Sequence, residues 1–303
     1  MTHHTLHADE VPITQAIVTG LINQQFPQWS DLPLEPFAAM GTDHVLYRLG
    51  EDLLVRLPRL VHTSAQVIKE YQWLPKLAIQ LPLAIPSPIA LGQSNETYPF
   101  QWAVYGLLAG EVPAVTPYAD DLLFAERLAQ FMNALQRIDT TGAPQPGAHN
   151  FGRGVPLRDR DAQTRQAIQS LAGMIDTTGA MAIWENALNA PVWDKPPVWI
   201  HGDLQAGNLL VDQGNLHAVI DFGGLAIGDP ACDLQVAWNF LGHRARAHFR
   251  QLVGLDDASW LRGKGWALSI AVIALPYYLN SNPHLVAISQ RAISALLEGD
   301  HSG

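Results

Sequence analysis

Three polar residues at fixed spacings between short apolar runs constrain the fold of this chain more than any other feature. Asp203 and Asn208 lie five residues apart in the stretch HGDLQAGN, which follows the run VWI and precedes NLLV. Asp221 comes thirteen residues after Asn208. It directly follows the run HAVI and is the first residue of Asp-Phe-Gly. Short apolar runs bounded by turn residues are typical of buried strands, so we expect the three side chains in loops at strand ends.

These residue types, in this order, suit phosphoryl transfer. That reaction needs a carboxylate to accept a hydroxyl proton, an amide and a second carboxylate to hold Mg²⁺, and positive charge near the phosphates. Asp203, Asn208 and Asp221 supply the first three of these groups. A loop aspartate considered alone is most often a turn residue or a helix cap. That explanation does not account for the ordered set flanked by apolar strands.

The remaining sequence divides into a strand-rich front third and a mainly helical remainder. Strand patterns in PFAAMG, HVLYRLG, DLLVRLPR and PFQWAVYGLL accompany helical patterns over residues 11–26 and 63–79. After Gly110, helical patterns cover residues 118–137, 161–190 and 230–297, and residues 140–160 read as a loop. We therefore expect two lobes, over residues 1–107 and 108–303.

Composition and charge exclude several classes of protein. The 303 residues are 48% hydrophobic and 15% charged, which indicates a folded chain, and the net charge of −10 disfavours a nucleic-acid or anionic-membrane binder. The longest apolar stretch, residues 266–279, contains Pro276 and is shorter than the roughly 20 residues that span a bilayer. A single cysteine, Cys232, and a start without a secretory pattern favour the cytoplasm.

The same stretches resemble the aminoglycoside phosphotransferase family. HGDLQAGNLLV and AVIDFGGLAIGDPACDL carry the resemblance, and LGEDLLVRLPR, VIKEYQWLPKLA, YPFQWAVYGLLAGE and FGRGVPLRDRDAQTR extend it over about residues 41–297. The resemblance implies an α+β, two-lobed protein-kinase-like fold. Its N-lobe would be a small antiparallel sheet and its C-lobe larger and mainly helical.

The resemblance also implies roles for single residues. Asp203 resembles the catalytic base, and Asn208 and Asp221 resemble the two Mg²⁺ ligands. Arg56 stands where kinases usually place a phosphate-binding lysine, and Glu70 stands where the partner of that basic residue lies. Arginine can bind phosphate, but its planar guanidinium is bulkier than an ammonium group, and the alternative for Arg56 is a surface arginine with a local partner. Lys69 and Arg48 are nearby cations that would share the role.

The resemblance places the nucleotide base at the crossing between the lobes, against the backbone of Tyr105, Gly106 and Leu107. The side chains of Tyr105 and Trp102 either line that pocket or belong to the core.

Further residues near the motif have expected supporting roles. His201 would support the catalytic loop, Asp229 would cap the helix that starts at Pro230, and Asp233 would either buttress the loop or lie on a helix face.

The sequence also departs from the family pattern. The hairpin at Gly41-Thr42-Asp43-His44 has one glycine, Gln205-Ala206 replaces a frequent His-Pro pair, and Gly224 replaces a polar residue. The Gln205-Ala206 change is expected to alter loop rigidity and not the chemical groups.

The resulting hypothesis is a Mg²⁺-dependent enzyme that moves the γ-phosphate of ATP or GTP to a hydroxyl of a small molecule. An aminoglycoside-type antibiotic suits the acidic balance of the chain. A kinase for a macrolide, or for a choline-like or sugar metabolite, is the alternative, as is a nucleotide-binding regulatory protein without turnover. No nucleic-acid or membrane partner is expected.

Overall fold

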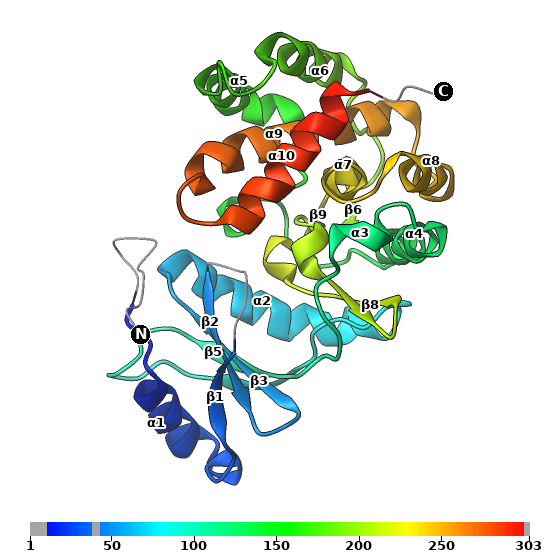
Figure 1. The fold of residues 1–303 in the computed structure, drawn as a ribbon. Coiled ribbons are helices and arrows are strands. Elements are labelled where there is room, and N and C mark those ends of the chain that lie inside the picture. Colours follow the sequence, from blue (N-terminus) through cyan, green and yellow to red (C-terminus); the bar gives the residue numbers. More distant parts are fainter. Residues whose placement is uncertain (1–10, 38–42, 300–303) are drawn as a thin grey trace. The chain divides into compact units, whose positions relative to one another are not determined.

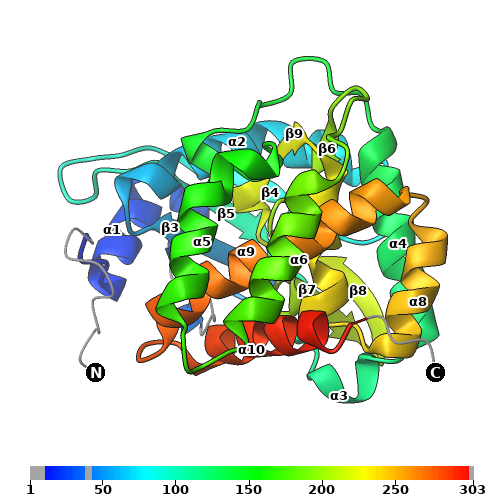
Figure 2. The same cartoon turned by 90° about the horizontal axis from the view of Figure 1, so that it is seen from above.

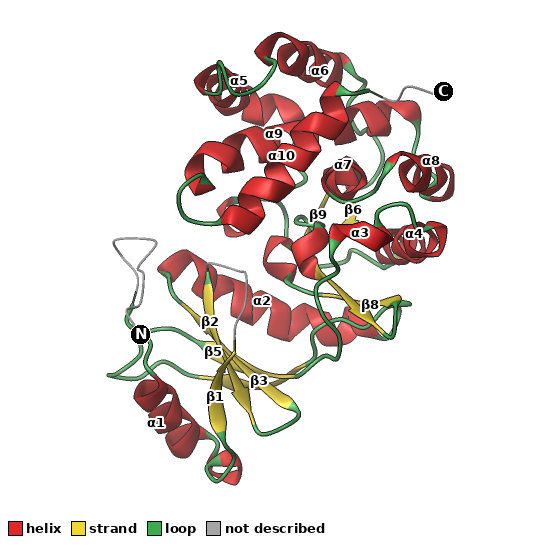
Figure 3. Cartoon of the chain, viewed as in Figure 1, coloured by secondary structure: helices red, strands yellow, loops and turns green. Residues whose placement is uncertain are grey.

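The computed structural model describes residues 11–37 and 43–299, which form two compact units. Unit 1 comprises Met1–Ile79, Ala84–Ala109 and Val219–Gly223, and unit 2 comprises Gln80–Leu83, Gly110–Ala218 and Gly224–Gly303. Unit 1 contains an antiparallel sheet and unit 2 contains most of the helices (Figure 3). The expected two-lobed, kinase-like α+β fold is confirmed.

The sheet of unit 1 has five strands in the order β1-β2-β3-β5-β4, all antiparallel to their neighbours. The strands are β1 (Leu34–Phe37), β2 (His44–Leu49), β3 (Leu53–Pro58), β4 (Pro88–Gly92) and β5 (Trp102–Gly106). The first strand begins two residues before the expected PFAAMG segment, whose last part lies outside the described residues. The turn at Gly41 and Thr42 lies outside them as well.

Two helices cover the faces of this sheet, α1 (Gln15–Gln25) and α2 (Val61–Ala78) (Figure 1). Because successive strand residues point to opposite faces, Val55 and Leu57 belong to a core shared with α1. Arg56, between them, points to the face that packs against α2. Trp102 and Val104 of β5 likewise join the α1 core, and Tyr105 faces α2. This alternation is what places polar side chains beside α2.

Unit 2 is built from packed helices around two short pairs of strands. Its helices are α3 (Val115–Tyr118), α4 (Leu122–Arg137), α5 (Asp161–Ser170), α6 (Thr177–Asn189), α7 (Val236–Asn239), α8 (His243–Leu252), α9 (Asp257–Tyr278) and α10 (Pro283–Leu297). The helix α9 packs against α5, α6 and α10 (Figure 2). The strand pairs are β6 (Val198–Ile200) with β9 (Ala226–Gly228), and β7 (Leu209–Asp212) with β8 (Asn215–Val219).

The long helix α9 contains the apolar stretch singled out in the sequence, and Trp266, Leu268 and Val272 on it are fully buried. Over the described part of the chain, no helix combines the length and apolarity needed to cross a membrane. The helix expected at 118–137 begins at Leu122, because the Asp121 carboxylate accepts from the backbone N–H groups of Leu123 and Phe124 and so caps the helix there.

Candidate active site

Arg56 and Glu70, fourteen residues apart in the sequence, form a buried ion pair in unit 1. One terminal nitrogen of the guanidinium donates to both carboxylate oxygens of Glu70, at 2.9 and 2.7 Å. Glu70 is fully buried and Arg56 is 9% exposed. The structure therefore brings together the two residues that the resemblance had paired.

Tyr105 completes the surroundings of Glu70. Its hydroxyl donates to the Glu70 carboxylate at 2.7 Å, so its side chain is engaged beneath α2. Burial raises the pKa of this hydroxyl well above its ordinary value, and the charge of Glu70 raises it further. Trp102 packs in the core shared with α1, which is the second of the two roles considered for it. The contact between Tyr105 and Glu70 follows from the register of β3 and β5, which no sequence motif reports.

Asp221 lies in the same unit and is the second carboxylate on Arg56. The other terminal nitrogen of the guanidinium donates to Asp221 Oδ1 at 2.8 Å, and the Asp221 side chain is 44% exposed. Burial alone would lower the pKa of Arg56, but the charges of Glu70 and Asp221 outweigh it and raise the pKa. Arg56 is thus a permanent cation that joins a buried carboxylate to a partly open one.

Lys69 and Arg48, the cations expected to share the role of Arg56, have different surroundings in the structure. The guanidinium of Arg48 is on the exposed side of β2 and donates to the Glu51 carbonyl at 3.2 Å. Lys69 is buried, and its Nζ donates to the backbone carbonyl of Gly223 at 2.8 Å. Burial lowers the pKa of Lys69 to about 8, against the opposing charges of Glu70 and Asp221. We call Arg56, Lys69, Glu70, Tyr105 and Asp221 the ion-pair group.

The backbone at the end of β5 is partly occupied by contacts within unit 1. The N–H of Gly106 donates to the Ser87 carbonyl at 2.9 Å, and the N–H of Leu107 donates to the Asp52 carbonyl at 2.7 Å. A nucleobase that binds against this segment would therefore have to use other backbone groups than these two donors.

In unit 2, the loop after β6 gathers amide groups around the carboxylate of Asp203. The Asn208 side-chain nitrogen donates to the Asp203 carbonyl at 2.8 Å and to Asp203 Oδ2 at 3.0 Å. The Gln205 amide donates to the same Oδ2 at 3.1 Å. The change at Gln205-Ala206 therefore adds a side-chain donor to Asp203, besides the altered loop rigidity that the sequence led us to expect. The residue that replaces a frequent histidine contacts the carboxylate directly.

Asp233 fixes the backbone of the same loop. Its two carboxylate oxygens accept the backbone N–H groups of His201 and Gly202, at 2.7 and 2.8 Å. His201 is fully buried, and its Nδ1 accepts the N–H of Asp203 at 3.2 Å. Burial raises the pKa of Asp233, and the two backbone donors oppose that rise. Of the two roles considered for Asp233, the structure supports the buttress. We call His201, Asp203, Gln205, Asn208 and Asp233 the catalytic-loop group.

Close packing of two backbone segments explains why a glycine occupies position 224. Gly202 has a φ of +84°, and a Cβ on it would collide with the Gly224 carbonyl. A Cβ on Gly224 would in turn lie 2.8 Å from the His201 carbonyl oxygen. The departure from the family pattern at this position thus allows two backbone segments of unit 2 to touch.

Asp229 caps the turn that follows, as expected. Its carboxylate accepts from the N–H of Ala231, and Pro230 stands at the first position of the 3₁₀ helix Pro230–Gln235. The structure adds a partner that the sequence did not indicate, because Arg262 of α9 forms a buried ion pair with Asp229 at 2.6 Å. Asp229 is therefore a structural anchor of unit 2.

The residues expected to hold Mg²⁺ have suitable donor atoms. The Asn208 nitrogen is engaged with Asp203, which leaves the amide oxygen as its ligating atom. Asp221 contributes a partly open carboxylate. Mg²⁺ prefers oxygen ligands and is usually bound by one or two protein groups together with substrate phosphates and water. Among the described residues no cluster of three or more acidic, histidine or cysteine side chains could by itself hold a metal ion.

Comparison with known proteins places these features in a family. Residues 35–266 match the model of a phosphotransferase enzyme family, APH. An aminoglycoside 3'-phosphotransferase of Escherichia coli is 26% identical over 120 residues, which are 39% of this chain and 43% of that protein. The chain thus spans less than half the length of this curated relative.

Solved structures share the fold over nearly the whole chain. The GDP complex of an aminoglycoside 2'-phosphotransferase-IIIa has a TM-score of 0.74 at 20% identity, over 95% of this chain and all of that chain. A macrolide 2'-phosphotransferase type I has a TM-score of 0.62 at 18% identity, over 93% of this chain and 98% of that chain. Likeness at this identity shows the fold. The family match covers well over half of the 303 residues, so the chain belongs to the phosphotransferase enzyme family.

Proposed function

We propose that this protein is a Mg²⁺-dependent kinase that transfers the γ-phosphoryl group of ATP or GTP to a hydroxyl of a small molecule. The single observation that carries the proposal is the arrangement around Asp203. A carboxylate on a rigid loop, held by amides at one oxygen, can accept a hydroxyl proton in a fixed direction. Membership of the phosphotransferase family supports the same conclusion.

The roles of the side chains follow from their chemistry. Asp203 orients the acceptor hydroxyl and takes its proton, and Asn208 and Asp221 hold the metal ion. Arg56 supplies the positive charge for the nucleotide phosphates, and Glu70 fixes its position. When bound, Mg²⁺ would neutralise charge on the phosphates during transfer. The backbone around Tyr105 to Leu107 remains our proposed location for the nucleobase.

We propose an aminoglycoside-type antibiotic as the first acceptor to test. The net charge of −10 suits a substrate that carries several ammonium groups, and similar structures include a kanamycin complex of an aminoglycoside phosphotransferase. A macrolide is the second candidate, because the macrolide 2'-phosphotransferase shares the fold over most of both chains. A small metabolite such as a choline-like compound or a sugar is the third. We expect the protein to act in the cytoplasm, where the nucleotide donors are.

The direct test is release of nucleoside diphosphate with Mg²⁺, measured with ATP and GTP separately against aminoglycosides, macrolides and amino-alcohol metabolites. Release stimulated by one class of compound and lost in Asp203→Asn would establish the activity and the substrate class. Nucleotide binding without stimulated release by any acceptor would contradict a kinase acting on these classes and favour a nucleotide-binding regulatory protein.

A further inference from the structure

Helix α2 contacts the segment Asp221–Gly223 through the side chains of Lys69 and Gln66. Lys69 is 8% exposed, which is unusual for a lysine, and its Nζ donates to the Gly223 carbonyl at 2.8 Å. Gln66, one turn earlier on the helix, lies so close to Gly223 that a Cβ there would be 2.9 Å from its Oε1. Residues three apart share one helix face, so Gln66 and Lys69 present a single surface to this segment.

The segment needs such support because the backbone of Asp221 is strained. Asp221 has a φ of +62°, in the left-handed region that residues with a Cβ seldom adopt. Conformations of this kind persist only where the surroundings fix them. Arg56 fixes the side chain of Asp221 through Oδ1. Lys69 supplies a main-chain bond two residues later.

We propose that Lys69 is a positioning residue that fixes the main chain of Asp221–Gly223, so that the Asp221 carboxylate is presented to Mg²⁺. The inference rests on the proposed function, because it assumes that Asp221 binds the metal. Arg56 and Lys69 thus act on different parts of the segment. The guanidinium of Arg56 binds the Asp221 carboxylate, and the ammonium group of Lys69 binds the backbone at Gly223.

A role as a nearby charge alone predicts the opposite sign. Replacing Lys69 with a neutral residue removes a positive charge near Asp221, and a less positive environment attracts a divalent cation more strongly. If Lys69 acted only through its charge, its loss would tighten Mg²⁺ binding. If Lys69 positions the segment, its loss weakens Mg²⁺ binding, by the roughly 10- to 100-fold typical of residues that orient a metal ligand.

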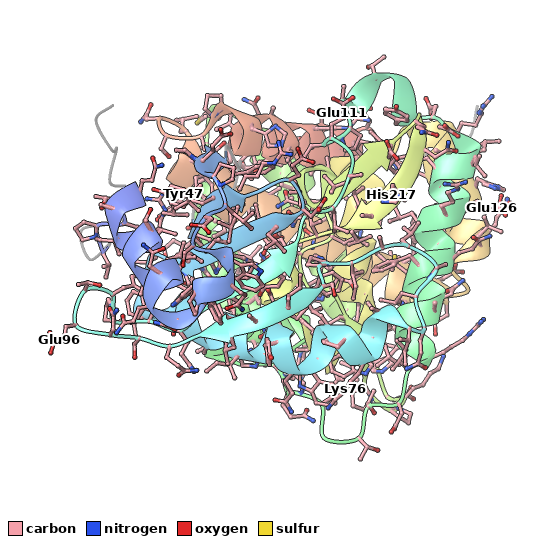
Figure 4. All side chains as sticks on the ribbon, turned by 90° about the horizontal axis from the view of Figure 1, so that it is seen from below. Tyr47, Lys76, Glu96, Glu111, Glu126 and His217 are labelled. Atoms are coloured by element: carbon pink, nitrogen blue, oxygen red, sulfur yellow. The ribbon has the colours of Figure 1, made fainter. Side chains whose placement is uncertain are left out.

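The experiment compares Lys69→Met with the control Lys76→Met and the rescue Lys69→Arg. Lys76 is an exposed lysine on the same helix (Figure 4), so its replacement removes the same charge without the Gly223 contact. Two quantities are measured at a temperature below the thermal unfolding midpoint of each variant. They are hydrogen–deuterium exchange of the peptide covering residues 219–224 without ligand, and the Mg²⁺ concentration that half-saturates binding of a fluorescent ADP analogue.

For Lys69→Met we expect faster exchange in this peptide and at least a tenfold rise in the half-saturating Mg²⁺ concentration. Lys76→Met should match the wild type, and Lys69→Arg should recover most of the loss because it keeps a cationic donor. Unchanged exchange, or tighter Mg²⁺ binding in Lys69→Met, would overturn the proposal. If Lys69→Met does not fold, Lys69→Gln takes its place with the same expectations. Wild-type nucleotide binding that ignores Mg²⁺ would refute the proposed function, whereas the exchange result tests the Lys69 contact independently.

Discussion

The ion-pair group of unit 1 and the catalytic-loop group of unit 2 are held together by different forces. In unit 1, two cations and two carboxylates compensate one another, and the pair of Arg56 and Glu70 is buried. In unit 2, the Asp203 carboxylate is held by neutral amides, and the loop that carries it is fixed through backbone N–H groups. The first group depends on charge balance, and the second depends on backbone geometry.

This difference predicts different consequences of substitution. Removing one charge from the ion-pair group leaves another buried and unpaired, so stability and the binding of nucleotide and metal should suffer together. Changing a side chain on the catalytic loop leaves the loop in place, so turnover should suffer more than binding. The following predictions test this contrast, from the largest expected effect to the smallest.

The largest loss of stability is expected for Glu70→Gln. It leaves the buried Arg56 guanidinium without its main partner, which typically costs about 3–5 kcal/mol. Urea denaturation should show this drop in the free energy of unfolding. Glu96→Gln, a change at an exposed loop residue of the same unit, should have almost no effect. A loss below about 1 kcal/mol for Glu70→Gln would mean that the ion-pair group is not balanced as described.

Asp233→Ala should destabilise unit 2 by about 2–4 kcal/mol, because two buried N–H groups lose their acceptor. Asp233→Asn keeps one acceptor oxygen and should lose roughly half as much. Thermal and urea unfolding of the three proteins would measure the difference. Equal stability of Asp233→Ala and the wild type would show that the loop does not depend on this carboxylate.

Gln205→Ala removes one of the neutral donors on Asp203 Oδ2. A hydrogen bond to a charged group is worth about 1.5–3 kcal/mol, so we expect turnover to fall roughly 10- to 100-fold with nucleotide affinity unchanged. Steady-state kinetics with the acceptor that the nucleoside diphosphate release assay finds would measure turnover. Gln290→Ala, at an exposed residue of α10, is the control. A weaker affinity for nucleotide with turnover intact would contradict the contrast between the two groups.

The smallest effect concerns Cys232, which lies outside both groups. Burial raises the pKa of its thiol, so the native state keeps the proton that the unfolded chain loses near pH 9. Stability should therefore decline as the pH rises above about 9, and Cys232→Ala should show a shallower decline. Ellman's reagent at pH 8 should leave the native protein unmodified and react with one thiol in urea. Rapid reaction of the native protein would show that the thiol is accessible.

The sequence predicted those parts of the site that depend on adjacent residues or on the family resemblance. The cap at Asp229-Pro230 depends on adjacent residues and can be inferred from them. The pairing of Arg56 with Glu70, the fold and the family follow from the resemblance, which the ordered motif around Asp203 and Asp221 carries.

Contacts that depend on tertiary packing could not be predicted from the sequence. Tyr105 meets Glu70 because of strand register, Lys69 meets Gly223 across 154 residues, and Arg262 meets Asp229 across 33. No periodicity or motif encodes such distances. The Gln205 contact is local, but the family pattern has a different residue pair at this position and so does not indicate that the Gln205 amide donates to Asp203.

The central claim is that Asp203 serves turnover and Asp221 serves metal binding. The most direct measurement determines both turnover and the Mg²⁺ dependence of nucleotide binding for Asp203→Asn and Asp221→Asn side by side. We predict that Asp203→Asn lowers turnover by about 10²–10⁴-fold and leaves the Mg²⁺ titration unchanged, and that Asp221→Asn shifts the titration to higher Mg²⁺. Full activity of Asp203→Asn, or an unshifted titration for Asp221→Asn, would contradict this account.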